Sequence, residues 1–153
     1  MIRFKVKPDP KRAYFFHVKV FDTIKRMRAN AAQHGCLSGG LDGEPVAQWK
    51  WAALSHGHTA IKVEKGKRDR TTPELGIMWF SFELLSAEIV SHECTHSALR
   101  WAKRVRLKVN GRHMDEREER FCYAQGEMVG QFWREIYRLA PARYLQVKGR
   151  KPR

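Results

Sequence analysis

The sequence has few cysteines, and no pattern pairs them. Cys36, Cys94 and Cys122 are widely spaced, odd in number, and form no CxxC motif in the 153 residues. This usage excludes a disulfide framework as the basis of the fold. It is typical of reduced thiols in a cytosolic protein.

Long hydrophobic runs are also lacking. Residues 1–8 (MIRFKVKP) contain no uninterrupted apolar region, so no secretory signal is expected there. The most apolar stretch, 75–90, is interrupted by Glu83 and Glu88 and is too short to span a bilayer. We therefore expect a cytoplasmic protein with no membrane partner.

Acidic residues are scarce. The chain has 30 Lys and Arg against 16 Asp and Glu, a net charge of +14, and its cations concentrate in 3–11, 62–70, 100–112 and 148–153. A basic surface attracts nucleic acid or acidic partners, although it can also be a solvated face with no dedicated partner. No zinc ribbon or RNP motif accompanies the charge.

The composition is that of a folded protein, with 42% hydrophobic and 11% aromatic residues. We expect one domain over 1–147, followed by a basic tail over 148–153. Hydrophobic patterning, caps and turn residues predict an α+β fold: an N-terminal strand and helix, a small and mostly antiparallel sheet, and two further helices. The expected elements are strands over 12–21, 46–54, 59–64 and 76–82, and helices over 23–34, 86–105 and 115–139, with a turn at Gly57 and a helix cap at Ser86.

The helix expected over 86–105 contains the sequence HECTH, an HExxH motif. Residues four apart on a helix lie nearly one above the other, so His92 and His96 should point the same way and supply half of a tetrahedral zinc site. Glu93 is rotated about 100° from His92. That places it too far round to ligate the same ion, but close enough to touch a water bound to it.

This helix is apolar on two sides, with Leu85, Ile89 and Leu99 on the histidine stripe and Val90 and Trp101 on another. We expect it to be packed between layers. The alternative to a metal site is that the histidines are hydrogen-bonded in the core or simply exposed. Cys94 points away from His92 and is expected to be a core residue.

A third ligand is expected from the acidic start of the next helix. Glu119 shares a stripe with Cys122, Gly126 and nearby Gly130, small residues that would let another helix approach closely. Glu118 competes, on a stripe with Phe121, Gln125, Met128 and Phe132. Alternatively, these acidic residues could only interact favourably with the positive end of the helix dipole. Cys122 is expected to be a packing residue.

HECTH on a helix, followed by Glu119 in EERFCYA at the start of the next helix, resembles the glutamate-zincin metallopeptidases. The similarity covers roughly 76–137 and extends to small zincin-like proteins of phages and mobile elements. The ImmA/IrrE-type peptidases are a more distant likeness, because the chain lacks the small-residue-then-asparagine pair that follows their third ligand.

The resemblance implies a zinc metallopeptidase acting on a protein or peptide substrate. His92, His96 and Glu119 would hold Zn²⁺, and Glu93 would activate its water. The strand over 76–82 would bind extended peptide. An oxyanion donor could be His113, Tyr123 or Arg100.

Two other functions remain open. One is a SprT-like protease acting on DNA-associated proteins, which would suit the positive charge and could use His113 as third ligand. The other is a non-catalytic basic nucleic-acid-binding protein, in which HExxH is a structural remnant.

Overall fold

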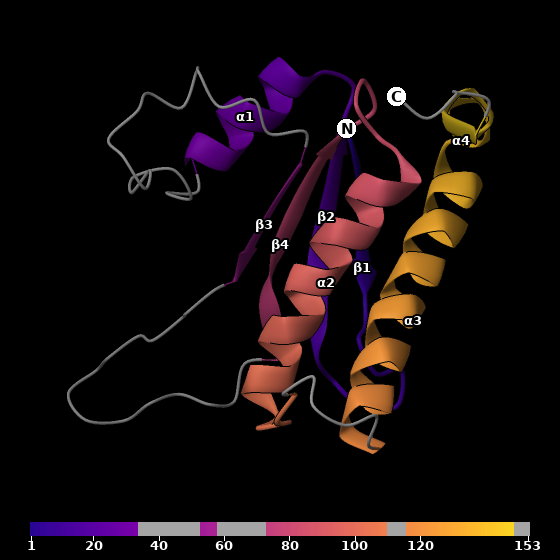
Figure 1. The fold of residues 1–153 in the computed structure, drawn as a ribbon. Coiled ribbons are helices and arrows are strands. Elements are labelled where there is room, and N and C mark those ends of the chain that lie inside the picture. The colour runs from indigo at the N-terminus through magenta and orange to yellow at the C-terminus, as the bar shows by residue number, and fades with distance from the viewer. Residues whose placement is uncertain (34–52, 58–72, 110–115, 149–153) are drawn as a thin grey trace.

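The computed structural model describes residues 1–33, 53–57, 73–109 and 116–148 (Figure 1). Within these ranges the chain is α+β, as the sequence predicts. In chain order the elements are β1 (Ile2–Val6), β2 (Phe15–Phe21), α1 (Ile24–Gln33), β3 (Ala53–Gly57), β4 (Glu74–Ser81), α2 (Ala87–Arg104), α3 (Glu116–Leu139) and α4 (Pro141–Lys148).

The four strands form one sheet in the order β1-β2-β4-β3. β1 pairs with β2 and β3 pairs with β4 antiparallel, whereas β2 and β4 are parallel. The sheet is therefore mixed, with two of its three pairings antiparallel. A register shift between Phe15 and Phe16 lies opposite Gly76, whose φ of 151° is a conformation that favours glycine.

Helices cover both faces of the sheet (Figure 1). Along β4, Met78 and Phe80 belong to a large core cluster that they share with α2 and α3. Their neighbours Ile77 and Trp79 point to the other face, where a smaller cluster includes Met27 of α1. This alternation follows from the two-residue period of a strand, and it explains why β4 is apolar almost throughout.

Helix α2 begins and ends close to its predicted limits. Ser86 is its N-cap and accepts a hydrogen bond from the Ile89 N–H at 3.3 Å. At the other end the Leu107 N–H donates to Ala102 O at 2.8 Å, while Arg106 has a φ of 57°. This is the pattern of a Schellman motif, with an arginine at the position where glycine is usual.

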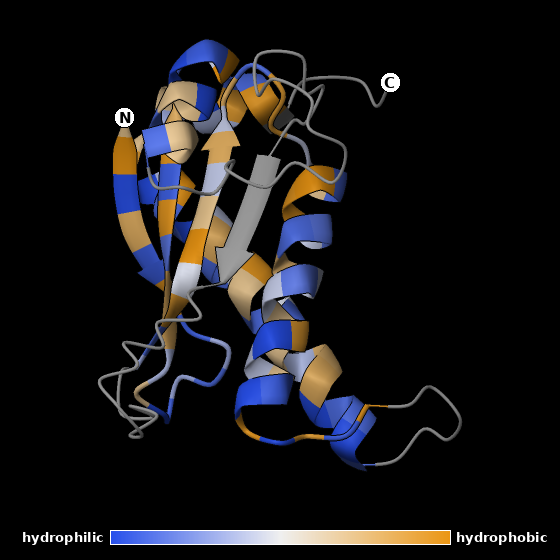
Figure 2. Ribbon diagram, turned by 90° about the vertical axis from the view of Figure 1, so that its left-hand side faces the viewer, coloured by the Kyte–Doolittle hydropathy of each residue, from blue (hydrophilic) through white to orange (hydrophobic). Residues whose placement is uncertain are grey.

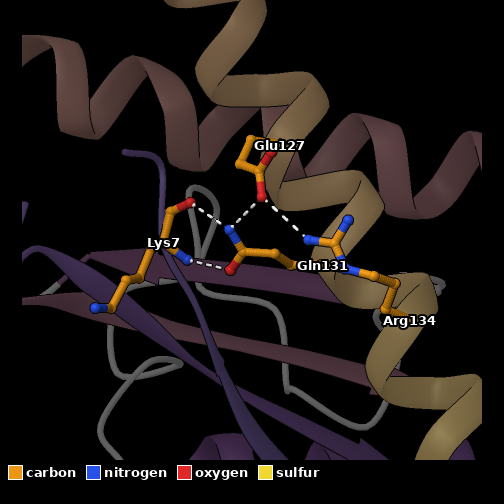
Figure 3. Close-up of polar contacts among 4 residues, drawn as sticks. All are labelled: Lys7, Glu127, Gln131 and Arg134. Atoms are coloured by element: carbon orange, nitrogen blue, oxygen red, sulfur yellow. Dashed lines mark hydrogen bonds and ion pairs between the residues drawn. The ribbon is translucent and has the colours of Figure 1, made fainter. Parts of the chain in front are cut away.

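Helix α3 lies beside α2 and is tied to two parts of the fold. Gln125 Nε2 donates to Ser91 Oγ of α2 at 3.0 Å. At the end of β1, the Gln131 amide accepts from the Lys7 N–H at 2.8 Å and donates to Lys7 O at 3.0 Å (Figure 3). Glu127 accepts from Gln131 and from Arg134, which fixes the orientation of that amide.

Two elements were not predicted. β1 was missed although Ile2, Phe4 and Val6 alternate with two cations, an alternation visible in Figure 2. α4 was missed because Pro141 was interpreted only as the end of α3, whereas proline is also favoured in the first turn of a helix. The N-terminal part therefore holds two strands and a helix, not the single strand and helix expected.

The middle of the chain is described only in part. β3 includes residues 55–57, where a turn at Gly57 was predicted, so that prediction was wrong. The expected strand over 59–64 and most of that over 46–54 lie outside the described residues, as do 149–153 of the expected tail. No helix in the described ranges is long and apolar enough to cross a bilayer.

Candidate metal centre

The imidazole rings of His92 and His96 converge on the exposed side of α2. Their Nε2 atoms are 3.0 Å apart, and their ring centroids are 4.6 Å apart with the planes at 82°. Both side chains are exposed, whereas Val90 and Cys94 on the opposite side of the helix are fully buried. The spacing therefore brings the two nitrogens together, as the motif predicts.

The separation of these nitrogens fits two positions of a tetrahedral zinc site. Zinc–nitrogen bonds of about 2.0–2.1 Å at tetrahedral angles place two ligand atoms roughly 3.3 Å apart. The same two atoms can share one hydrogen bond if one ring carries its proton on Nε2. When both rings carry the proton on Nδ1 instead, both Nε2 lone pairs are available to an ion.

The prediction that α2 is packed between layers was wrong within the described residues. Leu99 is 48% exposed, and it shares the outward side of the helix with the two histidines. The buried side comprises Val90, Glu93, Cys94, Ser97, Ala98, Trp101 and Ala102. The two histidines of the motif are thus exposed in the part of the chain that the structure describes, whereas Glu93 and Cys94 are not.

Glu93 and Cys94 belong to the inward part of the motif. Glu93 is only 8% exposed, and Cys94 is fully buried, which confirms its prediction as a core residue. Burial, reinforced by the nearby Glu93 charge, raises the pKa of the Cys94 thiol to about 12. Cys94 is therefore a thiol at neutral pH, and the thiolate needed for metal binding is not formed there.

The electrostatics around His96 favour a neutral ring. Partial burial, the neighbouring His92 and the charge of Arg100 together lower the pKa of His96. Neutral imidazole is the form that binds metal. Arg100 is thus close enough to act on the site electrostatically, whereas Tyr123, another candidate oxyanion donor, is 74% exposed on α3.

The small-residue face of α3 is not the face that packs on α2. Cys122 is exposed, and a Cβ added at Gly126 would meet nothing within 4 Å. At Gly130 the nearest atom would be Arg134 Nη1 at 3.5 Å, an ordinary contact. The buried residues of α3 are Ala124, Met128, Phe132 and Ile136. The expected packing through Cys122, Gly126 and Gly130 was therefore wrong.

This correction removes the original reason for preferring Glu119 over Glu118. Glu118 is half-buried on the stripe of Gln125, and Glu119 is exposed. In the part of the chain that the structure describes, no three His, Cys, Asp or Glu side chains are grouped closely enough to hold a metal. His113 lies outside the described residues.

The strand expected to bind peptide cannot do so by adding a further strand. β4 is paired on one side with β2 and on the other with β3, so its backbone groups are already used. Among the described strands, β3 is the outermost on this side of the sheet, and it contacts α2. The expectation that the strand over 76–82 binds extended peptide is therefore not met through backbone pairing.

Comparison of the chain with models of known protein families, with curated proteins and with solved structures gives no match.

Proposed function

We propose that this chain is a zinc-dependent hydrolase that cleaves peptide bonds. The observation that carries the proposal is the 3.0 Å separation of the His92 and His96 Nε2 atoms on an exposed helix surface. Two imidazoles at this separation, with a carboxylate in the intervening turn, would supply two of the ligands and the base that metal-assisted hydrolysis requires.

His92 and His96 would hold the ion, and we propose Glu119 as the third ligand. α2 and α3 run antiparallel (Figure 1), and the Ser91–Gln125 hydrogen bond fixes their register. Glu119 precedes Gln125 by six residues, about 9 Å along the axis, which brings it level with the helical turn that carries His96. Its exposed carboxylate lies on the outer surface of the helix pair, as do the histidines.

Zinc bound by these residues would polarise the scissile carbonyl and lower the pKa of water to about 7. Glu93 would accept the proton of the attacking water and return it to the leaving amine. Its place in the sequence is the support for this role, since a rotation of about 100° from His92 puts it next to the histidine stripe and not on it, and its side chain is largely buried. Arg100 would stabilise the negative charge that develops on the oxygen of the scissile carbonyl.

The substrate would lie as an extended segment along β3. The outer edge of a sheet presents N–H and C=O groups that can pair with a peptide backbone. β3 is the described edge strand next to α2, so a peptide added there would run past the helix that carries the histidines. This mode of binding recognises the peptide backbone more than its side chains.

Metal content and hydrolysis together test the proposal. Wild-type protein should contain about one zinc per chain, and His92→Ala or His96→Ala should lose it. Glu93→Gln should retain zinc while digestion of a denatured-protein library falls at least about a hundredfold, because the amide cannot take a proton. Glu88→Gln, an equivalent change at an exposed position of the same helix, is the matched control and should leave both unchanged.

Three results would contradict the proposal. Absence of bound transition metal after zinc reconstitution would remove the centre and favour the non-catalytic alternative. Loss of zinc in Glu93→Gln would make Glu93 a ligand. Hydrolysis unaffected by that change would place the base elsewhere.

A further inference from the structure

A basic pocket of about 410 Å³ lies at the end of the molecule where α2 finishes and α3 begins. It is formed by segments that are far apart in the sequence: the connection between β1 and β2, residues 105–108 after α2, and the first turns of α3 (Figure 1). The lining includes two aliphatic residues and five cationic side chains, Arg12, Arg106, Lys108, Arg117 and Arg120.

The part of the pocket lining that the structure describes is predominantly basic. None of these described lining residues is acidic, although Glu116, Glu118 and Glu119 lie in the same part of α3 as Arg117. Arg12 Nε is 3.4 Å from Asp9 Oδ2 in an ion pair, and five positively charged side chains contribute to the described lining. Like charges held around a concave surface focus a positive potential there and attract anions.

We propose that this pocket binds backbone phosphates of a nucleic acid. Four of the five cations are arginines, whose planar guanidinium groups match phosphate oxygens in pairs. A nucleic acid repeats its phosphates along the strand, so several of these side chains can be engaged by one ligand. A net charge of +14 and a sequence pI near 10.2 favour this partner over an isolated anion.

The position of the pocket relative to the histidines has a functional consequence. Val105 follows His96 by nine residues, about 14 Å along the helix direction. A strand held in the pocket would keep proteins attached to it near the proposed hydrolytic centre. The binding site itself does not depend on that centre and can be tested without zinc.

A substitution at Arg106 can reduce phosphate binding without destabilising the folded protein. Because its φ of 57° is a conformation that suits glycine, Arg106→Gly should remove a charge without destabilising the fold. The test variant combines Arg106→Gly with Lys108→Ala. The matched control, Arg3→Ala with Lys25→Ala, removes two exposed positive charges from β1 and α1, outside the pocket.

Fluorescence anisotropy with a labelled DNA duplex of about 20 base pairs provides the measurement, repeated over a series of salt concentrations. The logarithm of the association constant falls linearly with the logarithm of the salt concentration. Each lost phosphate contact should make this slope shallower by about 0.9, so the pocket variant, which lacks two cations, should have a slope shallower by about 1.8. If both proteins bind alike at 1 M salt, the pocket variant is then roughly 60-fold weaker at 0.1 M. The control should keep most of the wild-type slope.

The remaining outcomes overturn the assignment. Equal losses in the pocket variant and the control would mean that binding follows net charge over the whole surface. Absence of DNA binding would exclude the partner, and binding of a polyglutamate peptide in its place would identify an acidic protein. Displacement of DNA by inorganic phosphate at equal phosphate concentration would identify a site for the free anion.

Discussion

Arg106 holds an unfavourable backbone conformation that glycine would relieve. A left-handed φ, as at Arg106, costs an L residue about 1–2 kcal/mol of folded-state stability, and glycine avoids this cost. Glycine also lowers the stability by about 0.5–1 kcal/mol, because it has more conformational freedom to lose on folding. We predict that Arg106→Gly raises the free energy of unfolding by up to about 1 kcal/mol, measured by urea denaturation. Arg106→Ala, which keeps the strained φ, is the control. A loss of stability shared by Arg106→Gly and Arg106→Ala would show that the guanidinium stabilises the fold.

The relation between His92 and His96 could be predicted from the sequence because it depends only on helix geometry. The inward position of Cys94 followed from the same geometry. The exposure of Cys122 could not be foreseen, because an amphipathic helix with two partly apolar stripes does not reveal which one meets the neighbouring helix. The stripe that packs against the rest of the fold is the one with Gln125, Met128 and Phe132. Their contacts are tertiary and cannot be read from the helix alone.

At the scale of elements, the open side of α3 at Gly126 leads to a prediction opposite to the one that the sequence suggested. A Cβ there meets no atom within 4 Å, and alanine is favoured over glycine inside a helix by about 1 kcal/mol. Gly126→Ala should therefore raise Tm by roughly 2–4 °C, measured by thermal unfolding. A lower Tm would show that α3 does pack closely through this face.

The elements with strong local signals were predicted well. β4 and α2 are apolar segments with clear caps or turns, and α3 is long enough that its period is unmistakable. The parallel pairing of β2 with β4, however, joins segments more than 50 residues apart, and no local pattern specifies it. The position of β3 at the sheet edge depends on the same long-range order, which explains why the sequence did not reveal that β4 is paired on both sides.

At the scale of the whole molecule, the proposed zinc centre would join two helices that otherwise contact each other mainly through their buried sides. α2 and α3 cover the same face of the sheet and are linked by the Ser91–Gln125 hydrogen bond. An ion held by His92 and His96 of α2 and by Glu119 of α3 would add a second connection on the outer surface. Because the unfolded chain cannot assemble such a site, zinc would stabilise the folded state.

This linkage tests the third ligand without an enzyme assay. At a free zinc concentration of 100 times Kd, binding adds about 2.7 kcal/mol, which should raise the wild-type Tm by roughly 5–10 °C. We predict that zinc has little effect on Glu119→Ala, as on the control His92→Ala, and retains its effect on Glu118→Ala and His113→Ala. A zinc-induced shift that persists in Glu119→Ala but disappears in His113→Ala would overturn the Glu119 assignment. In that event the SprT-like alternative, in which His113 completes the site, would take precedence.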